Sequence, residues 1–250
     1  MPLREHFGTS GNWLFRWRSY LPLVLFVPVI AVMAIDPPVE GGQMADRLWE
    51  GLCLLVAVIG AVVRIVAVGS APAGTSGRNT AEGQVASTVN TTGLYSLVRH
   101  PLYVGNYLMW MGPALLPRHA WLALSISLAY WLYYERIMFA EEEFLRAKFG
   151  AEYERWASAT PAFVPGLGHP IHWRPAALPF SGRSALRREY SGWLGVVGSF
   201  LLLDFVGESA TYGEPHVDPM WLVIFGVTLV VYLVLRTLKK RTGVLKVEGR

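Results

Sequence analysis

The stretch that decides the fold is LWEGLCLLVAVIGAVVRIVAVG (residues 48–69), in which only Glu50 and Arg64 carry a charge. A run of about 20 apolar residues is long enough for a helix to cross the hydrocarbon core of a bilayer. Five further apolar runs of about this kind lie at residues 20–35, 102–117, 119–139, 192–206 and 220–235. We therefore predict an all-α polytopic integral membrane protein, a helical bundle of about six spans.

The composition agrees with a membrane protein, because 53% of the 250 residues are hydrophobic and only 16% are charged. Most Lys and Arg residues fall in segments that share one side of a six-span topology with both termini cytoplasmic, as the positive-inside rule requires. The net charge of +4 is thus explained by topology. No Lys/Arg-rich run is interleaved with aromatic residues, so we predict no nucleic-acid partner. The oligomeric state is open.

The chain has one cysteine, Cys53, inside an apolar run. A single cysteine excludes an intrachain disulfide and a thiolate metal cluster. The histidines have no neighbouring set of ligands that would indicate zinc. We predict no metal site.

The polar segments divide the chain into four parts. Residues 1–78 hold the N-terminal spans, and residues 79–165 hold the two motifs described below, a helical hairpin and an amphipathic helix that a kink at Gly150 interrupts. Residues 166–191 are rich in Pro, Gly and Arg and are expected to form an inner linker. Residues 192–250 contain the C-terminal pair of spans and a basic tail. The polar loop at residues 69–92 is expected to fold over a ligand.

The first motif is TGLYSLVRHPLYVG (residues 92–105). Pro101 suits the first position of a helix, so His100 is expected to cap that helix at the inner membrane face. A helix start offers free amide donors and a partial positive charge, to which Arg99 adds a full one, and this combination suits a carboxylate or phosphate. Tyr95 and Tyr103 provide aromatic faces for a purine or a cation. The same residue types are also common interfacial anchors, and that alternative stays open on physical grounds.

The second motif is AEEEFL (residues 140–145), at the inner end of an apolar run. Three consecutive carboxylates there are not explained by helix stability, because negative charge opposes the dipole near a helix C-terminus. Glu141 lies one turn before Leu145, so we expect Glu141 or Glu142 to face the bundle. An inward carboxylate favours a cationic or hydroxyl-bearing ligand.

Both motifs, with FGAEY (residues 149–153) and PAFVP (residues 161–165), resemble the superfamily of isoprenylcysteine carboxyl methyltransferases and phospholipid methyltransferases. The order and spacing of the motifs are specific, and the resemblance covers roughly residues 80–165. It implies S-adenosylmethionine-dependent methyl transfer to a lipophilic acceptor, with the cofactor in a pocket at the inner membrane face. The cofactor contacts carried over are Tyr95, His100, Pro101, Leu102, Tyr103 and Glu141, and more weakly Thr88, Val89, Asn90, Arg99 and Glu142. The resemblance implies no covalent nucleophile among the side chains.

The sequence departs from the superfamily at a position that bears on the substrate. In the prenylcysteine enzymes an arginine stands four residues before the cofactor-binding glutamate, whereas Ile137 stands there in this chain. Arg136 is the candidate substitute if the helix is rotated. The acceptor is therefore open among a prenylcysteine carboxylate, a lipid amine head group and a small thiol.

Two alternatives belong to other classes. Membrane sterol reductases share a similar C-terminal architecture and an Arg-His-Pro-Asn-Tyr motif, and they use NADPH. Leu102 stands here in place of that asparagine, and Asn106 follows Gly105 where the reductases have an acidic residue. These differences favour methyl transfer. The other alternative is a membrane protein of the same fold without catalytic activity.

Overall fold

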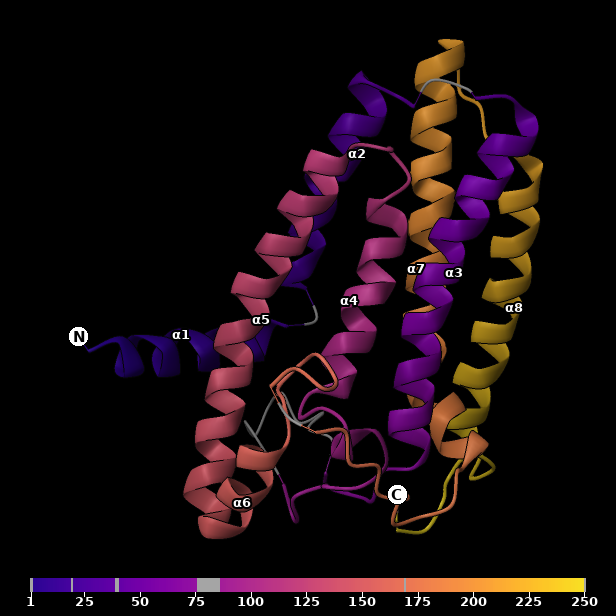
Figure 1. Cartoon of the computed structure of the whole chain (residues 1–250). Helices are drawn as coiled ribbons and strands as arrows, with labels where there is room; N and C mark the ends of the chain where they lie inside the picture. The colour runs from indigo at the N-terminus through magenta and orange to yellow at the C-terminus, as the bar shows by residue number, and fades with distance from the viewer. Residues whose placement is uncertain (1, 19, 39–40, 76–85, 169, 250) are drawn as a thin grey trace.

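The computed structural model describes residues 2–18, 20–38, 41–75, 86–168 and 170–249. Within these ranges the chain is helical and forms no β-strand, which confirms the predicted all-α class. Most of the helices run side by side along the bundle, whereas the N-terminal helix lies across it (Figure 1). The elements in chain order are α1 (Leu3–Trp17), η1 (Leu21–Leu25), α2 (Phe26–Ile35), α3 (Gln43–Gly69), η2 (Gly93–Ser96), α4 (Pro101–Ala114), α5 (Ala120–Phe149), α6 (Ala151–Ala159), α7 (Gly182–Tyr212) and α8 (Pro219–Arg241).

Three helices, α3, α7 and α8, are long and apolar enough to cross a membrane. A fourth span results if α1 and the segment Leu21–Ile35, which contains η1 and α2, are counted as one span, although these two segments are bent by 87° relative to each other. The six predicted spans are not confirmed. Helix α4 has only 14 residues, which correspond to about 21 Å, and the inner half of α5 carries several charges. The chain is an integral membrane protein with three or four spans by these criteria.

Helices α3 and α4 approach each other closely because Gly60 and Gly105 face each other where they cross. A Cβ atom at Gly60 would lie 2.5 Å from the carbonyl oxygen of Gly105. A Cβ atom at Gly105 would lie 2.5 Å from Cγ of Arg64. Small residues allow membrane helices to pack backbone against backbone. Gly105, the last residue of the first motif, therefore also makes room for the Arg64 side chain.

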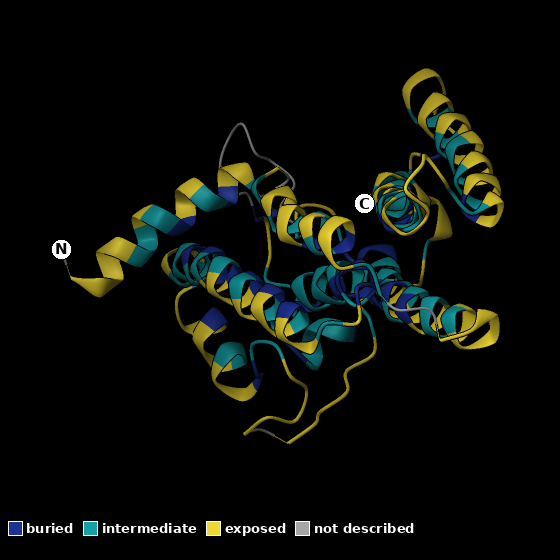
Figure 2. Ribbon diagram, turned by 90° about the horizontal axis from the view of Figure 1, so that it is seen from above, coloured by how far each residue is buried: buried dark blue, intermediate teal, exposed yellow. Residues whose placement is uncertain are grey.

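The main hydrophobic core lies between α2, α3, α4, α5 and α7, with Cys53, Ala57, Leu122, Phe200 and Leu203 fully enclosed. Seen from above, the buried faces point toward this centre, and the outward faces of the long helices are exposed (Figure 2). On α3 and α8 these outward faces are apolar. In an integral membrane protein such faces contact lipid rather than water.

Two helix boundaries shape the polar end of the bundle. Gly150 has a φ of 52° and separates α5 from α6, in agreement with the predicted kink. Helix α7 begins at Gly182, ten residues before the apolar run that starts at Gly192. Ser181 caps it by accepting a hydrogen bond from the Ser184 amide at 3.3 Å. The expected linker 166–191 is therefore shorter, because its last residues form the polar first turns of α7. Residues 76–85 of the expected ligand-covering loop, including the boundary at residue 78, lie outside the described residues.

Candidate functional site

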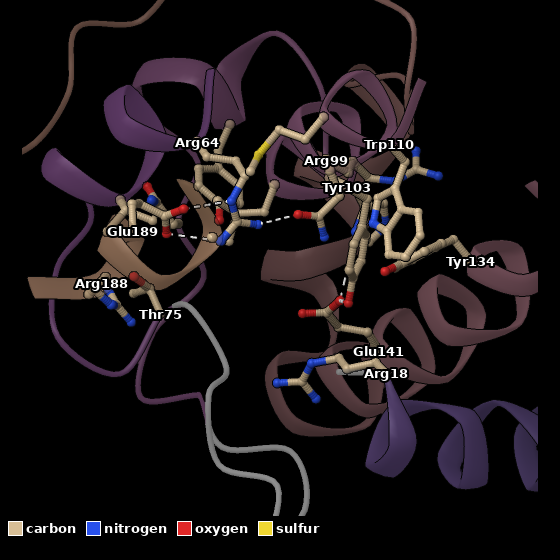
Figure 3. Close-up of a pocket in the computed structure, with 18 of the residues that line it drawn as sticks. Arg18, Arg64, Thr75, Arg99, Tyr103, Trp110, Tyr134, Glu141, Arg188 and Glu189 are labelled. Atoms are coloured by element: carbon tan, nitrogen blue, oxygen red, sulfur yellow. Dashed lines mark hydrogen bonds and ion pairs between the residues drawn. The ribbon is translucent and has the colours of Figure 1, made fainter. Parts of the chain in front are cut away.

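A cavity of about 680 Å³ lies at the polar end of the bundle, between the α4–α5 pair and helices α3 and α7 (Figure 3). Segments distant in sequence meet there, since Arg18 just after α1, residues of η1 and α2, and the 88–90 loop also reach it. Most of the predicted cofactor residues line this cavity: Thr88, Val89, Asn90, Tyr95, Arg99, His100, Leu102, Tyr103 and Glu141. Pro101, Glu142 and Arg136 are not among the lining residues.

The start of α4 is built as the sequence predicted, with His100 at the cap position and Pro101 at the first helical position. The backbone amides of Arg99 and His100 donate to the carbonyl oxygens of Pro161 and Ala162, at 2.9 and 3.1 Å. These bonds attach the first motif to the segment that follows α6. Leu102, in the first turn of α4, lines the cavity. The next two amides, of Tyr103 and Val104, donate to the carbonyl oxygen of His100 at 3.1 and 3.2 Å.

The two adjacent glutamates of the second motif point to different partners. The hydroxyl of Tyr103 donates to Oε2 of Glu141 at 3.0 Å, at the edge of the cavity. Glu142 instead accepts from Nε of Arg99 at 2.8 Å and forms a hydrogen bond of 2.9 Å with Nε2 of His100. Burial opposes ionisation of Glu142, but the bonds and charges of His100 and Arg99 lower its pKa to about 2. Glu142 is thus a partly buried, ionised brace behind the cavity wall.

Arg99, like Glu142, connects the helices around the cavity. Its Nη1 donates to the carbonyl oxygens of Ala157 and Thr160, at 3.0 and 2.7 Å. Together with the bond to Glu142, these contacts attach the start of α4 to α5 and to the end of α6. The expectation that Arg99 adds a charge for an anionic ligand is weakened by this geometry, because its charge is already compensated by Glu142.

Tyr95 lies on η2 and is held by Trp156, which also lines the cavity. The indole Nε1 of Trp156 on α6 donates to the Tyr95 carbonyl oxygen at 3.1 Å. Burial, and then the charge of Glu141, raise the pKa of Tyr95 above its usual range, so the phenol stays protonated at neutral pH. The Gly93 amide donates to the Arg174 carbonyl oxygen at 2.9 Å, which attaches η2 to the linker after α6.

The opposite wall contains a cluster that the sequence reasoning did not assign to the site. Arg64 on α3 donates from Nε and Nη2 to both carboxylate oxygens of Glu189 on α7, at 2.7 and 2.9 Å. Its Nη1 donates to Oδ1 of Asn106 on α4 at 2.6 Å. We call Arg64, Asn106 and Glu189 the three-helix clamp, because they join α3, α4 and α7 (Figure 3). The feature of the sequence that could have indicated this cluster is Arg64, a charged residue inside an apolar run.

Arg136, the candidate substrate residue, faces away from the cavity. Its guanidinium carbon lies 5.5 Å from the centre of the Phe7 ring on α1, and its Nε has no hydrogen-bond partner among the described residues. The neighbouring Ile137 is fully buried. The structure therefore does not bring either residue of this helical turn to the cavity.

Comparisons with known proteins agree with the motifs. The profile of the phospholipid methyltransferase family matches residues 48–152. The chain is 31% identical over 140 residues to the nickel-cobalt-cadmium resistance protein NccN of Alcaligenes xylosoxydans xylosoxydans, covering 56% of this chain and 62% of the relative. It is 33% identical over 75 residues to the protein-S-isoprenylcysteine O-methyltransferase of Schizosaccharomyces pombe, covering 30% of this chain and 32% of the relative. No solved structure matches the chain significantly.

A third relative is the cobalt-zinc-cadmium resistance protein CzcN of Cupriavidus metallidurans, 38% identical over 85 residues, which are 34% of this chain and 39% of the relative. The chain thus aligns with between 32% and 62% of the length of these relatives. In the part of the chain that the structure describes, no group of three or more His, Cys, Asp and Glu side chains is arranged to hold a metal ion.

The fold defines the class of the protein as an all-α integral membrane protein, and its matched part is similar to a family of membrane methyltransferases. Over residues 48–152 the chain is similar to the phospholipid methyltransferase family, and shorter segments are similar to isoprenylcysteine O-methyltransferases. The profile match ends at residue 152, within the first turn of α6. Helices α7 and α8 follow this residue, so the cavity wall that α7 forms lies outside the match.

Proposed function

We propose that the protein transfers a methyl group from S-adenosylmethionine to a lipophilic acceptor at the cytoplasmic face of the membrane. The observation that carries the proposal is the convergence of the motif residues Tyr95, His100, Tyr103 and Glu141 on one cavity. The similarity to the phospholipid methyltransferase family and to an isoprenylcysteine O-methyltransferase supports methyl transfer as the reaction. In this proposal both termini are cytoplasmic, and α4 and α5 complete the bundle within the membrane.

The residues around the cavity fit the chemical groups of this cofactor. Glu141 suits an ammonium group or ribose hydroxyls, and the start of α4 at Leu102 suits the methionyl carboxylate. Tyr95 and Tyr103 offer aromatic faces to the adenine ring or the sulfonium. Glu142 acts behind this surface, since its hydrogen bond with the cavity-lining His100 fixes the start of α4 against α5. When bound, the cofactor supplies an electrophilic methyl group, and the protein positions the acceptor in line and excludes water.

Calorimetric titration of the detergent-purified protein with S-adenosylhomocysteine, and separately with NADPH, tests this proposal. We expect S-adenosylhomocysteine to bind and NADPH not to bind. Glu141→Gln removes a charged acceptor, so it should weaken S-adenosylhomocysteine binding by about tenfold to a hundredfold. Glu143→Gln is the matched control, because Glu143 bonds to Arg4 and Arg146 outside the cavity. Binding of NADPH alone would indicate a reductase instead, and equal effects of the two variants would remove Glu141 from the cofactor site.

A further inference from the structure

Helix α1 differs from the long helices of the bundle in its direction. It lies across the bundle and is bent by 87° relative to the segment Leu21–Ile35 that follows it (Figure 1). Its main contact is with α5, where a Cβ atom at Gly11 would lie 2.1 Å from the carbonyl oxygen of Arg136 and 2.9 Å from Cβ of Ala140. The two backbones therefore touch, and one face of α1 is buried against α5.

A second face of α1 is apolar and exposed. Leu3, Trp13 and Trp17 are exposed by 75%, 54% and 44%. At about 100° per residue these three side chains lie within an arc of about 80° around the helix, which we call the apolar arc. His6 and Ser10 fall within the same arc, and the Ser10 hydroxyl donates to the His6 carbonyl oxygen at 2.7 Å. The face buried against α5 lies outside the apolar arc.

A third face of α1 is polar. Glu5, Thr9, Asn12 and Arg16 are all exposed and lie within an arc of about 60°, which we call the polar arc. An amphipathic helix in the plane of a membrane surface turns its apolar face to the acyl chains and its polar face to water. Tryptophan is enriched at this boundary, because its ring is apolar and its N–H is polar. The side chains of α1 thus have the distribution that a membrane surface requires.

The apolar arc continues the lipid-facing surface of the bundle. The segment that follows α1 exposes Leu23, Val24 and Val27, and Tyr20 is exposed between this segment and α1. Exposed apolar side chains on a membrane-spanning bundle contact lipid. Since α1 leaves this surface at nearly a right angle, it runs along the membrane plane when the bundle stands across the membrane.

The exposed side chains of α5 change character near the contact with α1. Leu124, Leu128 and Leu132 are exposed and apolar, whereas Glu135 is exposed and charged. Charged side chains are costly within hydrocarbon, so this change marks the point where α5 leaves it. Helix α1 contacts α5 in the turns that follow. The side chains of α5 and the direction of α1 therefore agree on where the membrane surface lies.

We propose that α1 is a membrane-surface helix that docks on the lipid bilayer, on the side of the membrane where the candidate site lies. The apolar arc inserts beneath the lipid head groups, and the polar arc faces water. The partner is the bilayer itself, and the proposal does not depend on the reaction proposed above. The bent pair is thereby divided, because α1 lies on the membrane while the segment Leu21–Ile35 enters the bundle.

Docking of α1 places the second motif at the membrane surface. Arg4 on α1 donates from Nε to Oε2 of Glu143 at 2.9 Å, and the ring centres of Phe7 and Phe139 are 5.8 Å apart. Glu141, two residues before Glu143, lines the cavity. A helix held in the membrane plane at this position keeps the cavity beside the head groups, where water can reach its polar side chains.

Collision measurements on spin labels test the position of α1. Cys53, the chain's one cysteine, is fully buried, so the unsubstituted protein should take up no label. Labels are attached through Trp13→Cys and Trp17→Cys on the apolar arc, and through Thr9→Cys and Asn12→Cys on the polar arc. The protein is placed in nanodiscs of phosphatidylcholine and phosphatidylglycerol. Oxygen concentrates in hydrocarbon, whereas a charge-neutral nickel chelate stays in water.

We expect oxygen to collide more often with labels on the apolar arc and the nickel chelate with labels on the polar arc. The ratio of the two collision rates should differ about fivefold or more between the arcs. Dominant nickel collisions at all four positions would place α1 in water. Dominant oxygen collisions at all four would place it inside the bilayer as part of a bent span. Either result, or equal ratios on the two arcs, would overturn the proposal.

A second test uses charge in place of a label. Trp13→Asp places a carboxylate on the apolar arc, and the neighbouring Asn12→Asp places one on the polar arc, both at exposed positions of α1. In the same nanodiscs, Trp13→Asp should weaken docking, so trypsin should cleave after Arg16 about fivefold faster or more. Asn12→Asp should leave the cleavage rate unchanged. Equal cleavage rates in the two variants would contradict insertion of the apolar arc into lipid.

Discussion

The two walls of the cavity are held by different chemistry. The α4–α5 wall is held by Glu142, which binds His100 and Arg99 over a sequence separation of about 40 residues. The α7 wall is held by Arg64 and Glu189, which lie 125 residues apart. The family profile covers the first wall and ends before the second. This difference indicates that the part of the chain matched by the family profile supplies one side of the site, while α7 supplies the other.

The largest effect is expected at the α3–α4 crossing, because α4 forms part of one wall and α3 carries Arg64, which holds the other wall. Gly60→Val would place atoms 2.5 Å from the carbonyl oxygen of Gly105 and 2.7 Å from the Met109 amide. Because backbone cannot move aside as a side chain can, we expect a loss of about 3 kcal/mol or more. Thermal unfolding in detergent measures it. Gly51→Val is the control on the same helix, since a Cβ atom there has open space, and an equal loss in both variants would contradict close packing at Gly60.

The α7 wall should be the more sensitive of the two to loss of a charge. Arg64→Met leaves the Glu189 carboxylate inside the bundle without its partner, which costs about 3 to 5 kcal/mol. Adding Glu189→Met removes the carboxylate that Arg64 binds, so the double variant should regain much of the lost stability. The measurement is a double-mutant cycle on the unfolding free energy. Additive losses would show that the clamp does not act as a unit.

The sequence predicted one wall better than the other for a physical reason. His100, Pro101 and Glu141 stand at the ends of apolar runs, where polar groups are conspicuous and helix periodicity fixes their direction. The pairing of Arg64 with Glu189 depends on which spans become neighbours, and no local pattern encodes that. The start of α7 was misplaced because its first ten residues are polar although helical. The count of six spans is not confirmed, because α4 is short and the inner half of α5 carries charges.

The α4–α5 wall should respond to pH in a defined direction. The pKa of Glu142 is lowered from 4.5 to about 2, so its contribution to stability is complete above pH 4.5 and is lost as the pH falls toward 2. Glu142→Gln should cost at most about 3 kcal/mol at neutral pH. The difference from the unmodified protein should shrink below pH 4.5, as followed by thermal unfolding from pH 3 to 7. The exposed Glu152→Gln is the control, and a constant difference across this range would contradict an ionised brace.

The smallest effect is expected beside the α4–α5 wall, where a single neutral hydrogen bond joins α6 to η2. Trp156→Phe removes the indole donor to the Tyr95 carbonyl oxygen but keeps an aromatic ring against Tyr153. A neutral hydrogen bond contributes about 1 kcal/mol, so the stability loss should be of this size. Because Tyr95 lines the cavity, S-adenosylhomocysteine affinity should also fall by a few-fold in calorimetric titration. Trp13→Phe on the exposed face of α1 should change neither quantity. If only stability falls in Trp156→Phe, Tyr95 supports the wall without contacting the cofactor, and the ligand surface of this wall reduces to α4 and Glu141.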